Sequence, residues 1–387
     1  MKQSKDRFLI THVGSLPRSR ELSDLLIRRE SKEKYDEGEY RELSRAGVQT
    51  VIKAQVDSGI DVINDGEQPR VGFQTYVPER MTGYGGVTER MPFQCFSDYP
   101  DFLEIWQNRQ IKTSKVYDAP AATEKIEYVG FDDARFECDT FDTCSAEVEG
   151  QYSERFMTAA SPGIVATTCQ NGGAYDTYEG YVRALARELK KEYDLIHERG
   201  YLLQLDCPDL AMERGGLFQK GSDAEFLDVV SLHVDAINSA VSDIPADRIR
   251  LHVCWGNYDG PHEWDPPLAD LLPILYQAKI GGLSIELANP RHQHEYEAFK
   301  THPLPDDMIL LPGVLDSTTN YVEHPQICCK RIIEAVDAVG DPTRVLPSTD
   351  CGFGTFAGWE MVGANITWAK FRALRKGADL AAKQVFS

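Results

Sequence analysis

The sequence lacks any run of about 18 apolar residues, so it offers no candidate membrane-spanning helix. Its first residues, 1–7, lead into only a few apolar positions, too few for a signal peptide. Basic residues are outnumbered, with 41 Lys and Arg against 61 Asp and Glu and a formal net charge of −20. Nucleic acids and anionic membranes bind basic faces, so neither is an expected partner. A cytoplasmic protein is the simplest interpretation.

The cysteine pattern lacks the regularity of a disulfide framework. The nine cysteines are odd in number and irregularly spaced, which favours reduced thiols. The chain also contains no internal repeat and no low-complexity tract. What it does contain is 387 residues of 42% hydrophobic content, which is ample for one large packed domain or two modest ones.

The order of elements predicts an α/β fold, a (β/α)₈ TIM barrel. Amphipathic segments of helical period, such as residues 178–199 with Asp176 as N-cap and Gly200 as C-cap, alternate with strand-like runs. The strand-like runs are residues 8–14, 61–65, 163–168, 201–206, 249–254, 283–287, 308–315 and 345–349. Eight strands alternating with helices are typical of this barrel. An open doubly wound sheet is disfavoured because no Gly-x-Gly-x-x-Gly turn follows the first strand.

Residues 74–152 depart from this rhythm within the single expected domain, residues 1–387. The stretch is rich in aromatic and acidic residues. It separates two expected strands by about 80 residues, far more than an ordinary connection, which marks a functional insertion. We expect a helix and a hairpin folded over the barrel mouth.

Four potential metal ligands end strand-like runs in the last third of the chain: His252, Cys254, Glu286 and Cys351. Residues i and i+2 of a strand point to the same face, so His252 and Cys254 can reach one ion together. If the other runs are nearby parallel strands, Glu286 and Cys351 end at the same mouth. One imidazole, two thiolates and a carboxylate suit Zn²⁺.

This ligand set predicts activation of a thiol. Four protein ligands are typical of a closed structural zinc, whereas a catalytic zinc keeps one position open. If Glu286 leaves when substrate arrives, a substrate thiol takes its position. Zinc stabilises thiolate at neutral pH, so the implied reaction is S-alkylation of a small thiol. Because a His-x-Cys pair often occurs by chance, a site without metal is the competing interpretation.

Acidic residues stand at the ends of other strand-like runs. Glu67 follows the second run, Asp206 ends the fourth and Asp316 follows the seventh. Barrel enzymes carry their sites at the C-terminal ends of the strands, so these carboxylates suggest a small polar substrate with an amino group. Helix capping is the alternative role for Asp206 and Asp65.

The same regions carry a family resemblance. The motifs are THVGSLPR at residues 11–18, DVINDGE at 61–67, LDCP at 205–208, HVC at 252–254, SIE at 284–286 and DCG at 350–352. In this order they resemble the catalytic barrel of cobalamin-independent methionine synthase, within the uroporphyrinogen decarboxylase-like superfamily. The resemblance covers nearly the whole chain apart from the expected insertion.

The resemblance implies zinc at the four ligands and methyl transfer to homocysteine from methyl-tetrahydrofolate or another methyl donor. By the same carry-over, Glu67 and Asp206 hold the amino group of homocysteine. The backbone at Gly14 and Ser15 holds its carboxylate. An ammonium group binds carboxylates and a carboxylate binds N–H groups, so these roles agree with the charges.

The chain departs from the family pattern where the family places its acid. Asp316 is present, but the family histidine two residues later is Thr318 here. Asp316 and His324 are therefore the expected catalytic residues, with His324 either replacing that acid or only capping a helix. Arg18, absent from the motif of the long synthases, is an expected contact for an anionic tail or else a surface ion-pair partner.

Two further departures concern the methyl donor: the chain lacks the extra N-terminal barrel of long family members, and residues 287–291 differ from the synthase pattern. One alternative is a zinc-dependent alkylation resembling the epoxyalkane:coenzyme M transferases. Another, from a different class, is a barrel with structural zinc and no thiol chemistry. The sequence leaves the oligomeric state open.

Overall fold

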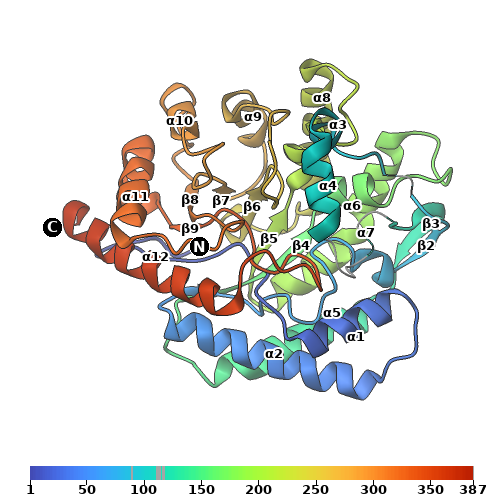
Figure 1. The fold of residues 1–387 in the computed structure, drawn as a ribbon, viewed down its shortest axis with the longest axis horizontal. Coiled ribbons are helices and arrows are strands. Elements are labelled where there is room, and N and C mark those ends of the chain that lie inside the picture. Colours follow the sequence, from blue (N-terminus) through green and yellow to red (C-terminus); the bar gives the residue numbers. More distant parts are fainter. Residues whose placement is uncertain (89, 110–114, 116–117, 387) are drawn as a thin grey trace.

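A computed structural model of the chain, which describes residues 1–88, 90–109, 115 and 118–386, contains a parallel seven-stranded sheet (Figure 1). Neighbouring strands follow the order β1-β4-β5-β6-β7-β8-β9, and each pair is parallel. The strands are β1 (Val62–Ile63), β4 (Glu154–Ala160), β5 (Leu202–Asp206), β6 (Ile249–Val253), β7 (Gly282–Ile285), β8 (Ile309–Leu315) and β9 (Ser348–Thr349). The sheet curls into a half-barrel with helices on its outer side (Figure 1).

The N-terminal segment, residues 8–13, lies between the two edges of this sheet. The main-chain N–H of Thr11 donates to the carbonyl of Pro347 just before β9, at 3.0 Å. On the other side, the N–H of Asp61 donates to the carbonyl of Ile10 just before β1, at 2.9 Å. The expected first strand is therefore an extended segment without regular strand pairing. The fold is barrel-like and consistent with a TIM barrel.

Helices surround the sheet. They are α1 (Arg20–Glu30), α2 (Glu37–Asp57), α3 (Gln94–Asp98), α4 (Pro100–Arg109), α5 (Phe131–Ala146), α6 (Pro162–Thr168), α7 (Tyr178–Glu198), α8 (Asp223–Ala240), α9 (Leu268–Leu275), α10 (Ala298–Thr301), α11 (Pro325–Val339) and α12 (Ala364–Val385). Alternate residues of β5 face opposite sides: Leu203 and Leu205 join the core shared with the helices, and Leu202 packs in a separate cluster. Among the described helices, none has both the length and the apolar character of a membrane span.

Two local predictions from the sequence were wrong. The expected strand at residues 163–168 is helix α6, because Ser161 caps the N–H of Ile164 at 3.0 Å and Pro162 occupies the first helical turn. The strand is β4, immediately before it. The N-cap of α7 is Thr177, whose hydroxyl accepts from the N–H of Gly180 at 3.0 Å, rather than Asp176.

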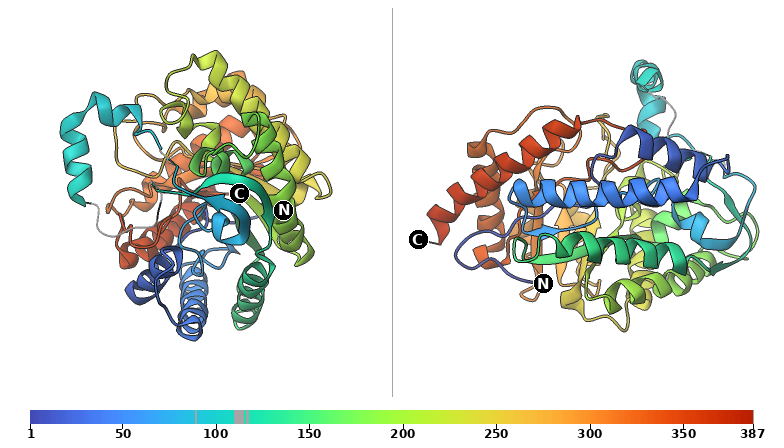
Figure 2. Two further views of the ribbon diagram at one scale, coloured as in Figure 1. Left: turned by 90° about the vertical axis from the view of Figure 1, so that its right-hand side faces the viewer. Right: turned by 90° about the horizontal axis from the view of Figure 1, so that it is seen from below.

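Residues 74–152 contain more than one kind of structure. A two-stranded antiparallel sheet pairs β2 (Met81–Gly85) with β3 (Ala121–Tyr128). Helices α3 and α4 stand apart from the outer helices (Figure 2), whereas α5 packs beside α2. Positions 89, 110–114 and 116–117 of the predicted insertion lie outside the described residues. A single insertion over the barrel mouth is not confirmed and stays a prediction.

A buried network of charges fixes the start of this region against α5 and α7. Arg70 Nη2 lies 2.9 Å from Glu137 Oε2, and Arg80 Nη1 lies 2.9 Å from Glu192 Oε2. Arg80 also pairs with Glu137, and the hydroxyl of Tyr76 donates to Glu192 at 2.6 Å. The four charged side chains are at most 4% exposed, so each depends on its partners in place of water.

Replacing Glu192 by Gln is expected to lower the free energy of unfolding by about 3 kcal/mol, because buried Arg80 then loses one of its two negatively charged partners. Denaturant unfolding followed by tryptophan fluorescence measures the change. The matched control is Glu179→Gln, since Glu179 pairs with Arg183 on the surface at 2.7 Å with both side chains at least half exposed. That change is expected to cost less than about 1 kcal/mol. Equal costs would contradict the account.

The pH dependence of this effect has a definite direction. Burial opposes ionisation of Glu192, but the charges of Arg80 and Arg70 and two tyrosine hydrogen bonds together lower its pKa. Stabilisation by the carboxylate is therefore complete above the unfolded-state pKa of about 4.3 and is lost as the pH falls through the folded value. The difference between wild type and Glu192→Gln should shrink in acid, and unfolding curves at pH 7 and pH 3 test this.

Candidate metal centre

Three parallel strands deliver the predicted ligands to one edge of the sheet. His252 lies in β6 with Cys254 directly after it, Glu286 directly follows β7, and Cys351 lies two residues beyond β9. In the register of β6 and β7, His252 is opposite Ser284, which places Cys254 level with Glu286. Because the strands run in the same direction, these side chains meet at their carboxyl ends.

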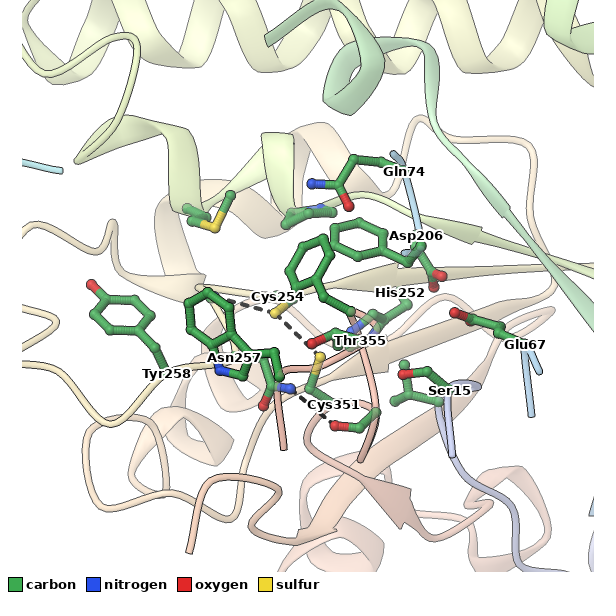
Figure 3. A pocket seen from close by; sticks show the side chains of 18 of the residues that line it. Ser15, Glu67, Gln74, Asp206, His252, Cys254, Asn257, Tyr258, Cys351 and Thr355 are labelled. Carbon is green, nitrogen blue, oxygen red and sulfur yellow. Dashed lines mark hydrogen bonds between the residues drawn. The ribbon is translucent and has the colours of Figure 1, made fainter. Parts of the chain in front are cut away.

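The ligand atoms of His252, Cys254 and Cys351 all lie within 4.8 Å of one another, and all three residues are buried. The sulfur atoms of Cys254 and Cys351 are 3.8 Å apart (Figure 3). The thiol of Cys254 also donates to Glu286 Oε1 at 2.9 Å. The structure therefore brings together all four predicted ligands, with the His/Cys/Cys group as its compact part.

The state of these side chains fits a cation. Neither ring nitrogen of His252 has a hydrogen-bond partner, although the residue is only 2% exposed. Burial and Arg250 lower the pKa of His252 to about 3, so the imidazole is in its neutral, ligating form. The pKa of Cys254 is raised by its hydrogen bond with Cys351, by burial and by Glu286. A cation relieves this crowding of negative charge, and two thiolates with an imidazole suit Zn²⁺.

Asp350 holds the loop that carries Glu286. Its carboxylate accepts hydrogen bonds from the main-chain N–H groups of the three residues after Glu286, at 2.9, 2.8 and 2.8 Å. Within that loop, the amide of Asn289 donates to Glu286 Oε2 at 3.2 Å. Burial, with the charge of Asp316, raises the pKa of Asp350 to about 7. This positioning residue was not predicted from the sequence, where its only signal is its place directly before Cys351.

Two carboxyl groups share a cavity with the sulfur atoms. Glu67 and Asp206 line the same cavity as His252, Cys254 and Cys351. In Figure 3 the sulfur atoms lie between these carboxyl groups on one side and Tyr258 on the other. Glu67 Oε2 is buried without a hydrogen-bond partner. Burial raises the pKa of both groups, and the charge of Glu67 adds to the rise at Asp206. Such a pair favours binding of a cationic group.

The N-terminal segment forms another part of the wall. Ser15 lines the cavity, and Gly14 directly precedes it in the chain. A Cβ atom on Gly14, at φ 154°, would come within 2.7 Å of Glu67 Oε1 and of Thr158 Cγ2, so only glycine fits there. The backbone of this segment thus approaches the carboxyl group of Glu67 closely.

Arg18 lies outside this cavity. Its guanidinium is buried and donates to the main-chain carbonyl groups of Gly354 and Glu67, the latter at 2.6 Å. Burial lowers its pKa to about 10. In this arrangement Arg18 joins two loops of the wall, in contrast to the surface ion pair that was the alternative expectation.

The two expected catalytic residues also lie outside the lining of this cavity. Asp316 borders a neighbouring cavity, and its oxygens accept from the N–H of Thr318 and the hydroxyl groups of Thr318 and Thr319, each at 2.8 Å. His324 is exposed, and its Nδ1 accepts from the N–H of Gln326 at 3.2 Å as the N-cap of α11. The structure does not bring these residues together with the thiols.

An aromatic wall completes the cavity, and only part of it was evident in the sequence. It comprises Phe73, Phe93, Phe96, Trp106, Tyr258, Phe356 and Trp359. Trp106 of α4 contacts Trp359 and Tyr258, with ring centroids 5.0 and 5.8 Å apart. Asn257, also missed, donates to the carbonyl of Gly352 at 3.0 Å (Figure 3) and joins the loops after β6 and β9. These contacts link positions far apart in the chain, for which a single sequence gives no signal.

The chain is similar to known proteins in sequence and in fold. The model of the cobalamin-independent synthase catalytic domain matches residues 8–96. A methionine synthase of Thermococcus kodakarensis is 24% identical over 380 residues, covering 96% of this chain and 93% of its own. The 2-hydroxypropyl-CoM lyase of Xanthobacter autotrophicus is 26% identical over 144 residues, covering 31% of this chain and 38% of its own.

Among solved structures, a B12-independent methionine synthase from Shewanella sp. W3-18-1, in complex with selenomethionine, superposes with a TM-score of 0.70. It is 18% identical and the match covers 98% of this chain and 99% of that one, which supports the fold. The family model, the synthase relative and the shared fold confirm the resemblance predicted from the motifs. The chain is thus similar to the cobalamin-independent methionine synthase catalytic domain, through the family model over residues 8–96 and through relatives and a fold that span nearly its whole length.

Proposed function

We propose that this chain is a zinc-dependent S-methyltransferase that methylates homocysteine or a close thiol. The observation that carries the proposal is a single cavity lined by His252, Cys254 and Cys351 together with the carboxyl groups of Glu67 and Asp206. A site for a thiol lies beside a site for an ammonium group. That combination matches an amino acid with a thiol side chain.

His252, Cys254 and Cys351 would hold the zinc, with Glu286 as the fourth ligand. Zinc bound there would supply a stabilised thiolate at neutral pH. Glu286 is the ligand suited to exchange, because Asn289 already donates to its Oε2 and remains as a partner when a thiol takes its place. Asp350 holds this loop through three main-chain N–H groups. The carboxylate of Glu286 can therefore move while the backbone of the loop stays in place.

The thiol substrate is oriented by charge. Glu67 and Asp206 would bind its ammonium group, whose positive charge would favour the ionised form of both buried carboxyl groups. Ser15 and the backbone at Gly14, which lie close to Glu67, would bind its carboxylate. Fixing both groups of the amino acid aims its sulfur at the metal ligands, and such positioning accounts for much of the rate of a bimolecular transfer.

The methyl donor would bind against the aromatic wall, with Phe93, Phe96 and Trp106 contributed by the segment around α3 and α4. Methyl-tetrahydrofolate or another methyl carrier presents a flat or apolar group that such rings accommodate. Asp316 and His324 were the expected catalytic residues, with His324 either replacing the family acid or only capping a helix. Neither borders the cavity in this conformation, which favours a donor that departs without a proton from either residue.

We further propose how the barrel is closed and how its mouth is covered. Residues 8–13, bonded to both sheet edges, would act as the eighth strand and close the (β/α)₈ barrel. Within residues 74–152, α3 and α4 would cover the barrel mouth. Their aromatic contacts with Tyr258 and Trp359 support this placement.

The second candidate is alkylation of coenzyme M, as the partial similarity to the 2-hydroxypropyl-CoM lyase suggests. Coenzyme M carries a sulfonate and no amino group. Glu67 and Asp206 would then face an anionic substrate, which disfavours binding. A structural zinc without thiol chemistry ranks third, because it leaves the same two carboxyl groups without a function.

The ligand assignment predicts that Cys351→Ser and His252→Ala each lose most of the bound zinc and the methyl transfer activity while staying folded. Elemental analysis of the purified protein measures the zinc, and circular dichroism checks the fold. Cys329→Ser is the matched control, since Cys329 is equally buried but lies in α11. A Cys351→Ser protein that retains zinc and activity would contradict the assignment of Cys351 as a zinc ligand.

The ammonium site predicts a selective effect of Asp206→Asn. Binding of homocysteine to the zinc-loaded protein should weaken by roughly 10-fold or more, the scale of one hydrogen bond to a charged group. Binding of 4-mercaptobutanoate, the same thiol without the amino group, should change little. Calorimetric titration with the two thiols makes the comparison, and equal losses for both would exclude an ammonium contact at Asp206.

A further inference from the structure

A second cluster of ligating side chains lies outside the cysteine site. His262 and Asp265 belong to the loop after β6, and His292 to the loop after β7. One ligand atom from each residue lies within 4.8 Å of the other two. His262 Nδ1 is 2.8 Å, and His292 Nε2 is 2.9 Å, from the same oxygen of Asp265. Three donor atoms thus converge on one point.

The outward nitrogen of each imidazole faces an acceptor. His262 Nε2 lies 2.9 Å from the main-chain carbonyl of Tyr258. His292 Nδ1 lies 3.7 Å from Glu295 Oε1. Metal-ligating histidines generally direct their second N–H to a carbonyl or carboxylate, which fixes the tautomer and the orientation of the ring. His262 has that arrangement, and His292 Nδ1 faces a carboxylate at the longer distance, while the other nitrogen of each ring is directed at the shared point.

The cluster is enclosed and rigid. The side chains of His262, Asp265 and His292 are 10%, 7% and 4% exposed. Trp255 stacks on the ring of His292 with centroids 3.9 Å apart and planes 13° apart. His262 adopts a left-handed backbone conformation with φ 55°, which is unfavourable for a residue with a side chain. Such strain is retained where a side chain must be directed to a particular point.

Hydrogen bonds alone leave this cluster unbalanced. Both partners of His262, a carboxylate and a carbonyl, accept hydrogen bonds, whereas a neutral imidazole has only one proton to donate. His292 donates its Nε2 proton to the same oxygen of Asp265, and its buried Nδ1 has no hydrogen-bond partner. Two donors compete for one oxygen while a ring nitrogen stays unpaired. A cation at the shared point removes both faults.

We propose that His262, Asp265 and His292 form a second metal site, distinct from the cysteine site, for a divalent ion of the Zn²⁺ class. The ion replaces the Nδ1 proton of His262, which moves to Nε2. The proton of His292 moves from Nε2 to Nδ1, where it faces Glu295, and no electron is transferred. Two imidazoles and one carboxylate suit Zn²⁺, with the remaining coordination taken by water.

The position of this site gives it an effect on the cavity. It joins the loop after β6, which carries Tyr258 of the aromatic wall, to the loop after β7, which begins at Glu286. The ring of His262 also packs on Tyr258 with centroids 4.2 Å apart. A metal here fastens the two loops that follow the ligand-bearing strands. This inference does not depend on the proposed methyl transfer.

Metal stoichiometry tests the proposal. Protein is saturated with Zn²⁺, freed of excess by gel filtration and analysed for zinc, with two ions per chain expected. His262→Gln and His292→Gln should each weaken the second ion by more than about 10-fold, since even indirect supports of a metal contribute that much. His294→Gln, an exposed histidine beside the cluster, is the matched control and should keep both ions.

A second measurement covers the case in which the histidine variants fail to fold. The Cys254→Ser/Cys351→Ser protein, loaded with Co²⁺, should keep one ion whose absorption spectrum lacks sulfur-to-metal charge transfer. Wild-type protein should show such a band from its other ion. No ion in the cysteine variant, or an ion retained there that is indifferent to both histidine substitutions, would overturn the proposal.

Discussion

The candidate site depends on the parallel register of β6, β7, β8 and β9. Parallel strands end at one edge of a sheet, so residues nearly 100 positions apart in the chain, Cys254 and Cys351, have sulfur atoms 3.8 Å apart. Any shift of register would separate them. Asp350 reinforces this geometry by bonding the loop after β7, so the segment after β9 that carries Cys351 also fixes the position of Glu286.

Buried groups of like charge underlie the ligands that we propose for the cavity. Cys254, Cys351 and Glu286 crowd acidic groups at one end, and Glu67 with Asp206 does the same at the other. At each end, ionisation of the acidic side chains is unfavourable without a nearby positive charge, and a bound cation would make it favourable. A metal ion at the first and a substrate ammonium at the second satisfy both. In the proposed function, the binding of metal and of amino acid would thus share one electrostatic cause.

The sequence predicted the parts of the site that local patterns encode. His252 and Cys254 share a strand face, and Glu286 and Cys351 end strand-like runs, so their convergence followed from the barrel. The strand predicted at residues 163–168 failed because a Ser-Pro cap outweighs β-branched residues, and Ser161 now caps α6. Asp350, Trp359 and the His262 cluster were missed, because their partners come from loops whose approach depends on tertiary packing. His324 is the N-cap of α11, which is the alternative role that its position before a proline had suggested.

The central claim is that a substrate thiol enters the metal shell in place of Glu286. Zinc-edge X-ray absorption of the zinc-loaded protein, recorded with and without homocysteine, tests it most directly. The account predicts a difference spectrum in which zinc gains a sulfur neighbour and loses an oxygen neighbour, because Glu286 moves to Asn289. A spectrum that homocysteine leaves unchanged, at concentrations where calorimetry shows the thiol bound, would contradict it.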